Sequence, residues 1–168
     1  KLAIQKAGDT GVSLVTMSNL DHTGRIGTYS EMAVEAGMAA IACTGFWGRA
    51  AAGVAPFGGR EGKLGTNPIS ISFPFAPSGT LLLDFATSMA AEGKLRVYRA
   101  RGQALPEEWV LDSKGKPSKD PNDFYNGGAI LPMGGMTGGH KGFALSFMVS
   151  LLGGVLGQLG SERSRIAA

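Results

Sequence analysis

Apolar and polar residues alternate in several short stretches of the chain, and this alternation predicts β-strands. Residues 12–17 alternate and are rich in β-branched side chains, which indicates a strand. Residues 39–44 are apolar at successive positions, which favours a strand in the centre of a sheet. Two further strands are expected over 67–73 and 80–85, with a turn over 74–79 between them.

Helical patterns lie between these predicted strands. Residues 29–36 predict one helix, which ends at Gly37, and residues 87–101 predict another. Residues 1–8 have the pattern of the end of a helix that stops at Gly8. Because strands and helices alternate along the first part of the chain, the sequence predicts an α/β fold.

The strongest helical pattern covers residues 141–159, which are apolar almost all round. A membrane span is the alternative, but the stretch is of borderline length and contains polar residues. Gly153, Gly154 and Gly157 favour a buried helix that packs closely against its neighbours. We therefore expect no membrane partner.

The remaining stretches are rich in glycine and turn-forming residues. The 27 glycines follow no Gly-X-Y period, which excludes collagen and indicates glycine-rich loops. Residues 45–65 form one such loop, and residues 103–128 are polar and turn-rich. With 168 residues the chain is long enough for one domain with a hydrophobic core.

The charge and cysteine content argue against several classes of protein. The formal net charge is +3, from 16 basic and 13 acidic residues, which is too mild to predict a nucleic-acid partner. The single cysteine, Cys43, lies in an apolar run and reads as a small buried side chain. No spacing suits a metal site, and we expect a cytoplasmic protein. Residues 1–8 lack a signal-peptide core, and the chain has no initiator methionine, so we expect a fragment of a longer protein.

The two histidines, His22 and His140, are both bordered by glycines in predicted loops. A histidine in such a loop is free to meet a ligand, whereas one on an apolar helix face is usually structural. For His22 this placement favours a functional role. For His140 a functional and a surface role remain equally open.

Three further segments, two of them rich in glycine, are weaker candidates for a small-molecule site. Residues 44–48 and 56–62 could form the wall of a cofactor site, but an ordinary glycine-rich loop is the favoured interpretation. Residues 66–68 add polar side chains before a strand, where they cap a turn as readily as they bind.

The segment 84–88 ends an apolar strand and precedes a predicted helix. Ligands of open α/β sheets bind at the carboxyl ends of strands. Asp84 could accept hydrogen bonds from ribose hydroxyls, and a helix N-terminus there could hold an anion. Alternatively, Thr87 or Ser88 simply caps the helix, and the pattern does not separate these interpretations.

Residues 134–142 lead into the last predicted helix and superficially match a phosphate-binding loop. The Walker pattern requires Gly-Lys-Ser/Thr, but His140 precedes Lys141 here and Gly142 follows it, so this is not a P-loop. The segment can still hold a phosphate or a carboxylate. No Gly-x-Gly-x-x-Gly follows a strand, so any dinucleotide site is not of the Rossmann type.

Taken in order, five stretches of the chain resemble the malate/L-lactate dehydrogenase family, which includes ureidoglycolate and L-sulfolactate dehydrogenases and cyclic imino-acid reductases. Each stretch is weak alone, but the five in register over nearly the whole chain are specific. They cover residues 18–29, 54–68, 83–94, 105–112 and 120–143.

The resemblance implies a non-Rossmann α/β fold with a mixed sheet flanked by helices, as in L-sulfolactate dehydrogenase. It implies an NAD(P)-dependent oxidoreductase that transfers a hydride between NAD or NADP and a small 2-hydroxy or 2-oxo acid such as malate or lactate. It also implies a homodimer. His22 aligns with the histidine proposed as proton acceptor in some members, and we take it as proton acceptor or donor. The expected cofactor contacts are Asp84, Phe85, Ala86, His140, Lys141 and Gly142.

Residues 1–168 are therefore expected to be the cofactor-binding core of a larger dehydrogenase. From the resemblance, we expect these residues to lie between an N-terminal Ser-His-Gly segment, which helps family members to bind substrate, and the family's C-terminal part. The alternative is a truncated, non-catalytic module for nucleotide binding or dimer assembly. The choice of substrate acid, and of NAD or NADP, stays open.

Overall fold

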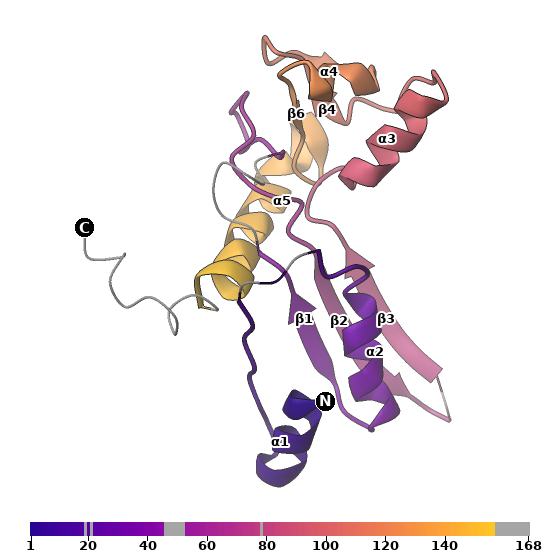
Figure 1. Cartoon of the computed structure of the whole chain (residues 1–168), viewed down its shortest axis with the longest axis vertical. Helices are drawn as coiled ribbons and strands as arrows, with labels where there is room; N and C mark the ends of the chain where they lie inside the picture. Colours follow the sequence, from indigo (N-terminus) through magenta and orange to yellow (C-terminus); the bar gives the residue numbers. More distant parts are fainter. Residues whose placement is uncertain (19, 21, 46–52, 78, 157–168) are drawn as a thin grey trace, which may run out of the picture.

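The computed structural model describes residues 1–18, 20, 22–45, 53–77 and 79–156. Its elements form two groups along the length of the molecule, with α5 between them (Figure 1). In chain order they are α1 (Leu2–Thr10), α2 (Gly27–Glu35), β1 (Ala40–Cys43), β2 (Ile69–Phe75), β3 (Gly79–Phe85), α3 (Glu92–Ala100), β4 (Val110–Leu111), β5 (Pro117–Ser118), α4 (Pro121–Tyr125), β6 (Ala129–Ile130), α5 (Gly135–Ser150) and the π-helix η2 (Leu151–Val155).

The first group, here called the sheet unit, consists of α2 and the antiparallel sheet β1-β2-β3. Helix α2 packs on one face of the sheet through small side chains, because Gly27, Ser30 and Ala33 recur at helical spacing on its buried side. On the facing strand β2, the Ser72 hydroxyl donates to the Ser30 carbonyl oxygen at 2.9 Å, and the Ser30 and Ser70 hydroxyls lie 2.7 Å apart. Serine hydroxyls therefore join the helix to the sheet.

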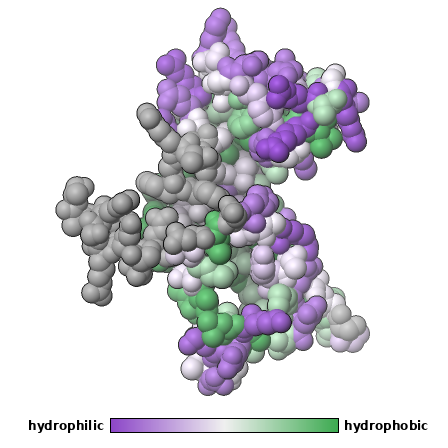
Figure 2. Space-filling view, viewed as in Figure 1, coloured by the Kyte–Doolittle hydropathy of each residue, from purple (hydrophilic) through white to green (hydrophobic). Residues whose placement is uncertain are grey.

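The opposite face of this sheet is apolar and open to solvent. Ile41, Ile71 and Leu83 stand opposite one another in register, so their side chains share this face. Ile41 is 72% exposed and Leu83 is 39% exposed. In the space-filling view, apolar residues come to the surface on the half of the molecule that holds α1 and the sheet unit (Figure 2).

The second group, here called the core unit, contains the buried apolar core. It combines the antiparallel sheet β5-β4-β6 with α3 and α4. Val54 joins this sheet through a parallel bridge to Ile130 and forms an antiparallel bridge with Leu64. The larger cluster of buried side chains consists of Val54, Leu64, Ala90, Leu95, Leu105, Val110 and Ile130.

Helix α5 buries a face of small residues and exposes large ones. Gly139, Gly142 and Ser146 are buried at helical spacing, whereas Phe147 and Met148 are exposed. A Cβ atom at Gly142 would overlap the backbone of Met133. These contacts require backbone to approach backbone, which only small residues permit.

The predicted α/β fold is confirmed, and most predicted elements are present with shifted ends. The helix predicted over 29–36 is α2, and the strands predicted over 67–73 and 80–85 are β2 and β3. The named strands pair antiparallel, and the parallel component among the described residues is the bridge between Val54 and Ile130.

The strand predicted over residues 12–17 is wrong. The alternation is present, but the segment has no ladder partner within the described part of the chain, and Val12 and Leu14 are exposed. The prediction that 39–44 is a central strand is also wrong in position, because β1 is an edge strand of the sheet as described. An apolar run indicates burial on both faces only where other elements cover both faces of the sheet, and here Ile41 lies on an open face.

Helix ends differ from the sequence prediction for identifiable reasons. Helix α1 continues past Gly8 to Thr10 and ends at Gly11, which adopts the left-handed conformation with φ of 83°. The helix predicted over 87–101 starts only at Glu92. The region 103–128, predicted as turns, contains β4, β5 and α4.

The helix predicted over 141–159 begins at Gly135, and its apolar residues are not all buried. Packing through Gly153 and Gly154 is confirmed, since both lie against the backbone of Gly45. Gly157 lies outside the described residues. In the described part of the chain, no helix has the length and apolar character needed to cross a membrane.

Candidate functional site

A turn at residues 22–27 carries the first predicted site residue, His22. The side chain of His22 is exposed, and its Nδ1 accepts a hydrogen bond from the Gly24 backbone N–H at 3.0 Å. The Tyr29 hydroxyl donates to the Thr23 carbonyl oxygen at 2.9 Å, and the hydroxyls of Thr23 and Thr44 lie 3.3 Å apart. The turn is thereby held both to α2 and to the residue that follows β1.

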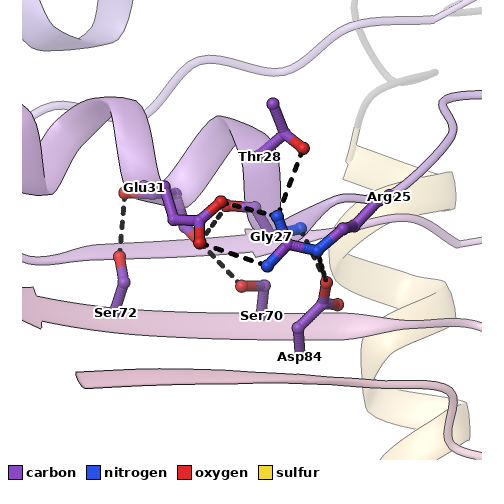
Figure 3. A network of polar contacts seen from close by, with 8 residues as sticks. Arg25, Gly27, Thr28, Glu31, Ser70, Ser72 and Asp84 are labelled. Carbon is purple, nitrogen blue, oxygen red and sulfur yellow. Dashed lines mark hydrogen bonds and ion pairs between the residues drawn. The ribbon is translucent and has the colours of Figure 1, made fainter. Parts of the chain in front are cut away.

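Asp84 ties this turn to the carboxyl end of β3. Its Oδ2 accepts from the Gly27 backbone N–H at 3.0 Å and lies 3.5 Å from Nε of Arg25 (Figure 3). A Cβ atom at Gly27 would overlap the Asp84 carboxylate, so a larger residue there would displace this carboxylate from the Gly27 N–H. The second oxygen of Asp84, Oδ1, takes no part in these contacts, and the side chain is 18% exposed.

Arg25 is itself oriented by Glu31 on α2. Its Nη1 and Nη2 donate to the two carboxylate oxygens of Glu31 at 2.6 and 3.1 Å, in the fork geometry typical of this pair (Figure 3). The hydrogen bond from Arg25 lowers the pKa of Glu31, and the same bond raises the pKa of Arg25. Arg25 therefore stays cationic beside Asp84.

The chain after Asp84 is fixed by hydrogen bonds from Thr87 to backbone carbonyl groups rather than by a helix. Phe85 and Ala86 are half-buried, and the Thr87 hydroxyl donates to the carbonyl oxygens of Thr66 and Asn67 at 3.0 and 2.8 Å. Helix α3 starts at Glu92 and has Ala91 as its N-cap, without a side-chain cap. Two of the interpretations left open by the sequence are therefore wrong, namely helix capping by Thr87 or Ser88 and an anion site at a helix N-terminus there, because α3 begins only at Glu92.

The Thr87 segment connects the two stretches predicted to contact a cofactor. The Met133 backbone N–H donates to the Thr87 carbonyl oxygen at 2.9 Å. The same Met133 backbone packs against Gly142 of α5. Residues 84–86 and 140–142 are thus held by one backbone framework.

The structure corrects the predicted setting of His140, because this residue lies on α5 and not in a loop. Its ring packs edge-on against Phe57 with centroids 5.6 Å apart. His140 and Lys141 are exposed, whereas Gly142 is buried. The glycines beside His140 have low helix propensity and therefore suggested a loop. In the structure they lie in the helix and allow close packing, as at Gly139, where a Cβ would lie 3.1 Å from Phe57.

The other glycine-rich segments divide into a described and an undescribed part. Phe46, Trp47 and Gly48 lie outside the described residues. In the segment 56–62, Phe57 contacts His140, and the neighbouring residues line a shallow hollow of about 200 Å³: Pro56, Gly59, Arg60, Glu61 and Lys63. Residues 66–68 are structural, since the Asn67 side-chain amide is buried and donates to the Ser146 carbonyl and hydroxyl oxygens at 3.3 and 3.2 Å.

The structure therefore assembles part of the predicted site. It joins the His22 turn to Asp84, and it joins residues 84–86 to 140–142, but no contact among the described residues links His22 to His140. A larger hollow of about 410 Å³ lies on α3 and includes none of the predicted site residues; Gly93, Lys94, Val97, Tyr98 and Trp109 line it. The sequence analysis missed Arg25 and Gly27 as partners of Asp84, although both fall in the first stretch of family resemblance.

Comparison with known proteins gives a consistent result. A family model described as malate/L-lactate dehydrogenase matches residues 1–166. The chain is 45% identical over 159 residues to a malate dehydrogenase of Pyrococcus abyssi, which covers 93% of this chain and 42% of that protein. It is 43% identical over 156 residues to an L-sulfolactate dehydrogenase of Methanothermobacter thermautotrophicus, with 93% and 43% covered.

A solved structure shares the fold. The delta1-piperideine-2-carboxylate reductase from Pseudomonas syringae pvar. tomato matches with a TM-score of 0.83 and 34% identity, over 93% of this chain and 45% of that one. The chain thus spans less than half the length of these relatives.

Proposed function

The chain belongs to the malate/L-lactate dehydrogenase family, and on that premise we propose that residues 1–168 are the cofactor-binding core of an NAD(P)-dependent dehydrogenase. The substrate class is a small 2-hydroxy or 2-oxo acid such as malate or lactate, as the names of the relatives suggest. The observation that carries the proposal is the link between the His22 turn and Asp84 at the carboxyl end of β3.

The residues at this edge fit a nicotinamide dinucleotide. Asp84 is half-buried and keeps Oδ1 available as an acceptor for ribose hydroxyls, while Oδ2 is held by Gly27. Lys141 is exposed on α5 and offers a cation to a phosphate. We place Phe85, Ala86, His140 and Gly142 as the other cofactor contacts, since the backbone framework holds them beside these two residues. NAD and NADP both remain candidates.

The reaction requires a group at the oxygen of the substrate. When bound, the nicotinamide cofactor supplies or accepts the hydride at C2 of the acid. We place His22 at the substrate oxygen, because its side chain is exposed on a turn that Asp84, Thr44 and Tyr29 hold in place. By analogy with the family we also propose a homodimer, and the single half-buried thiol of Cys43 suits the cytoplasm.

A binding and turnover measurement tests the proposal. Two forms are compared: residues 1–168 alone, and a longer protein that contains them and has the length of the relatives. Both are titrated with NADH and NADPH by fluorescence and assayed with malate, lactate and their oxo acids. Binding with turnover is expected in the longer form. Binding without turnover in both forms would favour a non-catalytic nucleotide-binding or dimer-assembly module, and no binding in either form would overturn the proposal.

A further inference from the structure

Two carboxylates flank one guanidinium group beside the proposed cofactor contact Asp84. Glu31 on α2 accepts from Nη1 and Nη2 of Arg25 at 2.6 and 3.1 Å, and Nε of Arg25 lies 3.5 Å from Oδ2 of Asp84 (Figure 3). Arg25 thus lies between an acid on the helix and an acid at the end of β3. The charges form a row that runs from Glu31 through Arg25 to Asp84.

Arg25 is held in this row by several contacts. Its Nη1 lies 3.5 Å from the Thr28 hydroxyl, in addition to the fork with Glu31, and the Gly27 N–H fixes the same Asp84 oxygen that faces Nε. The contacts engage every nitrogen of the guanidinium group. We therefore treat Arg25 as a positioning residue, which acts on a ligand of Asp84 through its charge.

The proposed function brings the nicotinamide half of the cofactor to this row of charges. His22 is proposed to lie at the substrate oxygen, and the hydride passes between C2 of that substrate and the nicotinamide. Arg25 follows His22 by three residues, so their Cα atoms are at most about 11 Å apart. Because Arg25 contacts Asp84, we take the ribose at Oδ1 to be the one that carries the nicotinamide.

The oxidised and reduced forms of a nicotinamide cofactor differ by one charge in this half of the molecule. The oxidised ring is a cation, the reduced ring is neutral, and the remaining groups are the same. A negative charge on the protein near the ring therefore favours the oxidised form, and a positive charge favours the reduced form. Glu31 and Asp84 act in the first direction, whereas Arg25 acts in the second.

We propose that Arg25 and Glu31 set the relative affinity of this site for oxidised and reduced cofactor through their opposite charges; this rests on the proposed function. Arg25 offsets the charge of Asp84 and so favours the reduced form. Glu31 offsets Arg25 in turn and limits that effect. The two side chains are 53% and 36% exposed, so water and salt weaken their influence without removing it.

Two charge-removing substitutions test the proposal, because they act in opposite directions. Calorimetric titration gives the dissociation constants for NAD⁺ and NADH, and for the NADP pair. Arg25→Gln should raise the ratio of the constant for the reduced form to that for the oxidised form about two- to fivefold, and Glu31→Gln should lower it by a similar factor. If the ion pair between Arg25 and Glu31 only stabilised the turn, both substitutions would break the same pair and would not move the ratio in opposite directions.

Matched controls separate the charge from the shape of these side chains. Arg25→Lys keeps the positive charge, so its ratio should stay within about twofold of the unsubstituted protein. Glu35→Gln removes the same kind of carboxylate from the exposed last residue of α2, about one turn beyond Glu31, and should move the ratio less than Glu31→Gln does. Raising the salt concentration from about 0.05 M to about 0.5 M should shrink both shifts, because the Debye length falls.

The possible outcomes distinguish this proposal from the proposed function. Shifts of opposite sign in Arg25→Gln and Glu31→Gln support it, whereas shifts of the same sign, or a ratio that neither substitution changes, overturn it. If the unsubstituted protein binds neither form of the cofactor, the proposed function fails as well. Circular dichroism shows whether each variant is folded, and if one is not, the sign of the shift in the other still decides.

Discussion

The core unit and the sheet unit are held together by different kinds of contact. Seven apolar side chains form the larger buried cluster of the core unit, and the fully buried Leu95 and Val110 are among them. In the sheet unit, the layer between α2 and the strands is closed by the hydroxyls of Ser30, Ser70 and Ser72. The two units therefore contribute differently: the core unit supplies the buried apolar surface that stabilises the fold, and the sheet unit positions the polar residues of the candidate site.

Hydroxyl contacts have directional requirements that apolar contacts lack. The serine layer therefore fixes how α2 sits on β2, and with it the positions of Gly27 and Arg25 at the start of the helix. Those two residues hold Asp84. The site thus depends on a small number of hydrogen bonds, whereas the core unit depends on the summed burial of many side chains.

The largest expected effect is on stability and falls in the core unit. Leu95→Ala removes a fully buried side chain and should lower the free energy of unfolding by about 2–5 kcal/mol. Urea denaturation followed by circular dichroism measures the change. A loss below about 1 kcal/mol would show that the cluster around Leu95 repacks and is not the main source of stability.

The second-largest expected effect is on cofactor affinity at the candidate site around Asp84. Asp84→Asn removes the charge that faces Arg25 and weakens the bond from Gly27, and a hydrogen bond to a charged group contributes about 1.5–3 kcal/mol. We expect weaker NADH or NADPH binding, together with a lower free energy of unfolding, because the bond from Gly27 also joins α2 to β3. Isothermal titration measures the affinity, and Asp112→Asn serves as a control carboxylate on the turn between β4 and β5. Equal effects of the two substitutions would contradict a role for Asp84 at the site.

A smaller effect is expected in the serine layer. Ser70→Ala removes one hydroxyl, but Ser30 still donates to the Gly27 carbonyl oxygen at 3.0 Å, so the loss should be about 1 kcal/mol. A double-mutant cycle of Ser30→Ala and Ser70→Ala, measured by urea denaturation, isolates the contact between them. Additive effects in the cycle would show that this contact does not couple α2 to the sheet.

The smallest effect is expected on the open face of the sheet. Leu81 is 54% exposed, so Leu81→Thr should change the free energy of unfolding by no more than about 0.5 kcal/mol in this chain. The substitution at Leu95 provides the contrast, because that leucine is fully buried. A destabilisation at Leu81 comparable with that at Leu95 would mean that the open face is covered in solution.

The sequence predicted those parts of the fold that local pattern determines. The alternation in 67–73 and 80–85 gave two paired strands, and the spacing in 29–36 gave α2. It failed where tertiary contacts decide the outcome. Val54 and Leu64 lay in a stretch predicted as loop, yet they pair with each other and are buried in the core unit. No local period predicts a single bridge of this kind.

For the candidate site, too, the sequence predicted only the features that local pattern determines. Asp84 was a candidate because it lies at the end of an apolar strand, which is visible in the sequence itself, and its contact with a cofactor stays a prediction. Its partner is the backbone amide of Gly27, 57 positions away, and a backbone donor leaves no trace in residue type. His140 was assigned to a loop because its neighbouring glycines have low helix propensity, which close packing overrides on α5.

The glycine face of α5 also has a consequence for mutational tolerance. Along this helix, Gly142 has no space for even one methyl group and Gly139 has little, while Phe147 and Met148, on the exposed side, tolerate a change of size. A saturation library over α5 should therefore return two interleaved sets of positions, one almost invariant and one permissive, repeating with the pitch of the helix. The invariant set would mark the side along which the rest of the molecule is assembled.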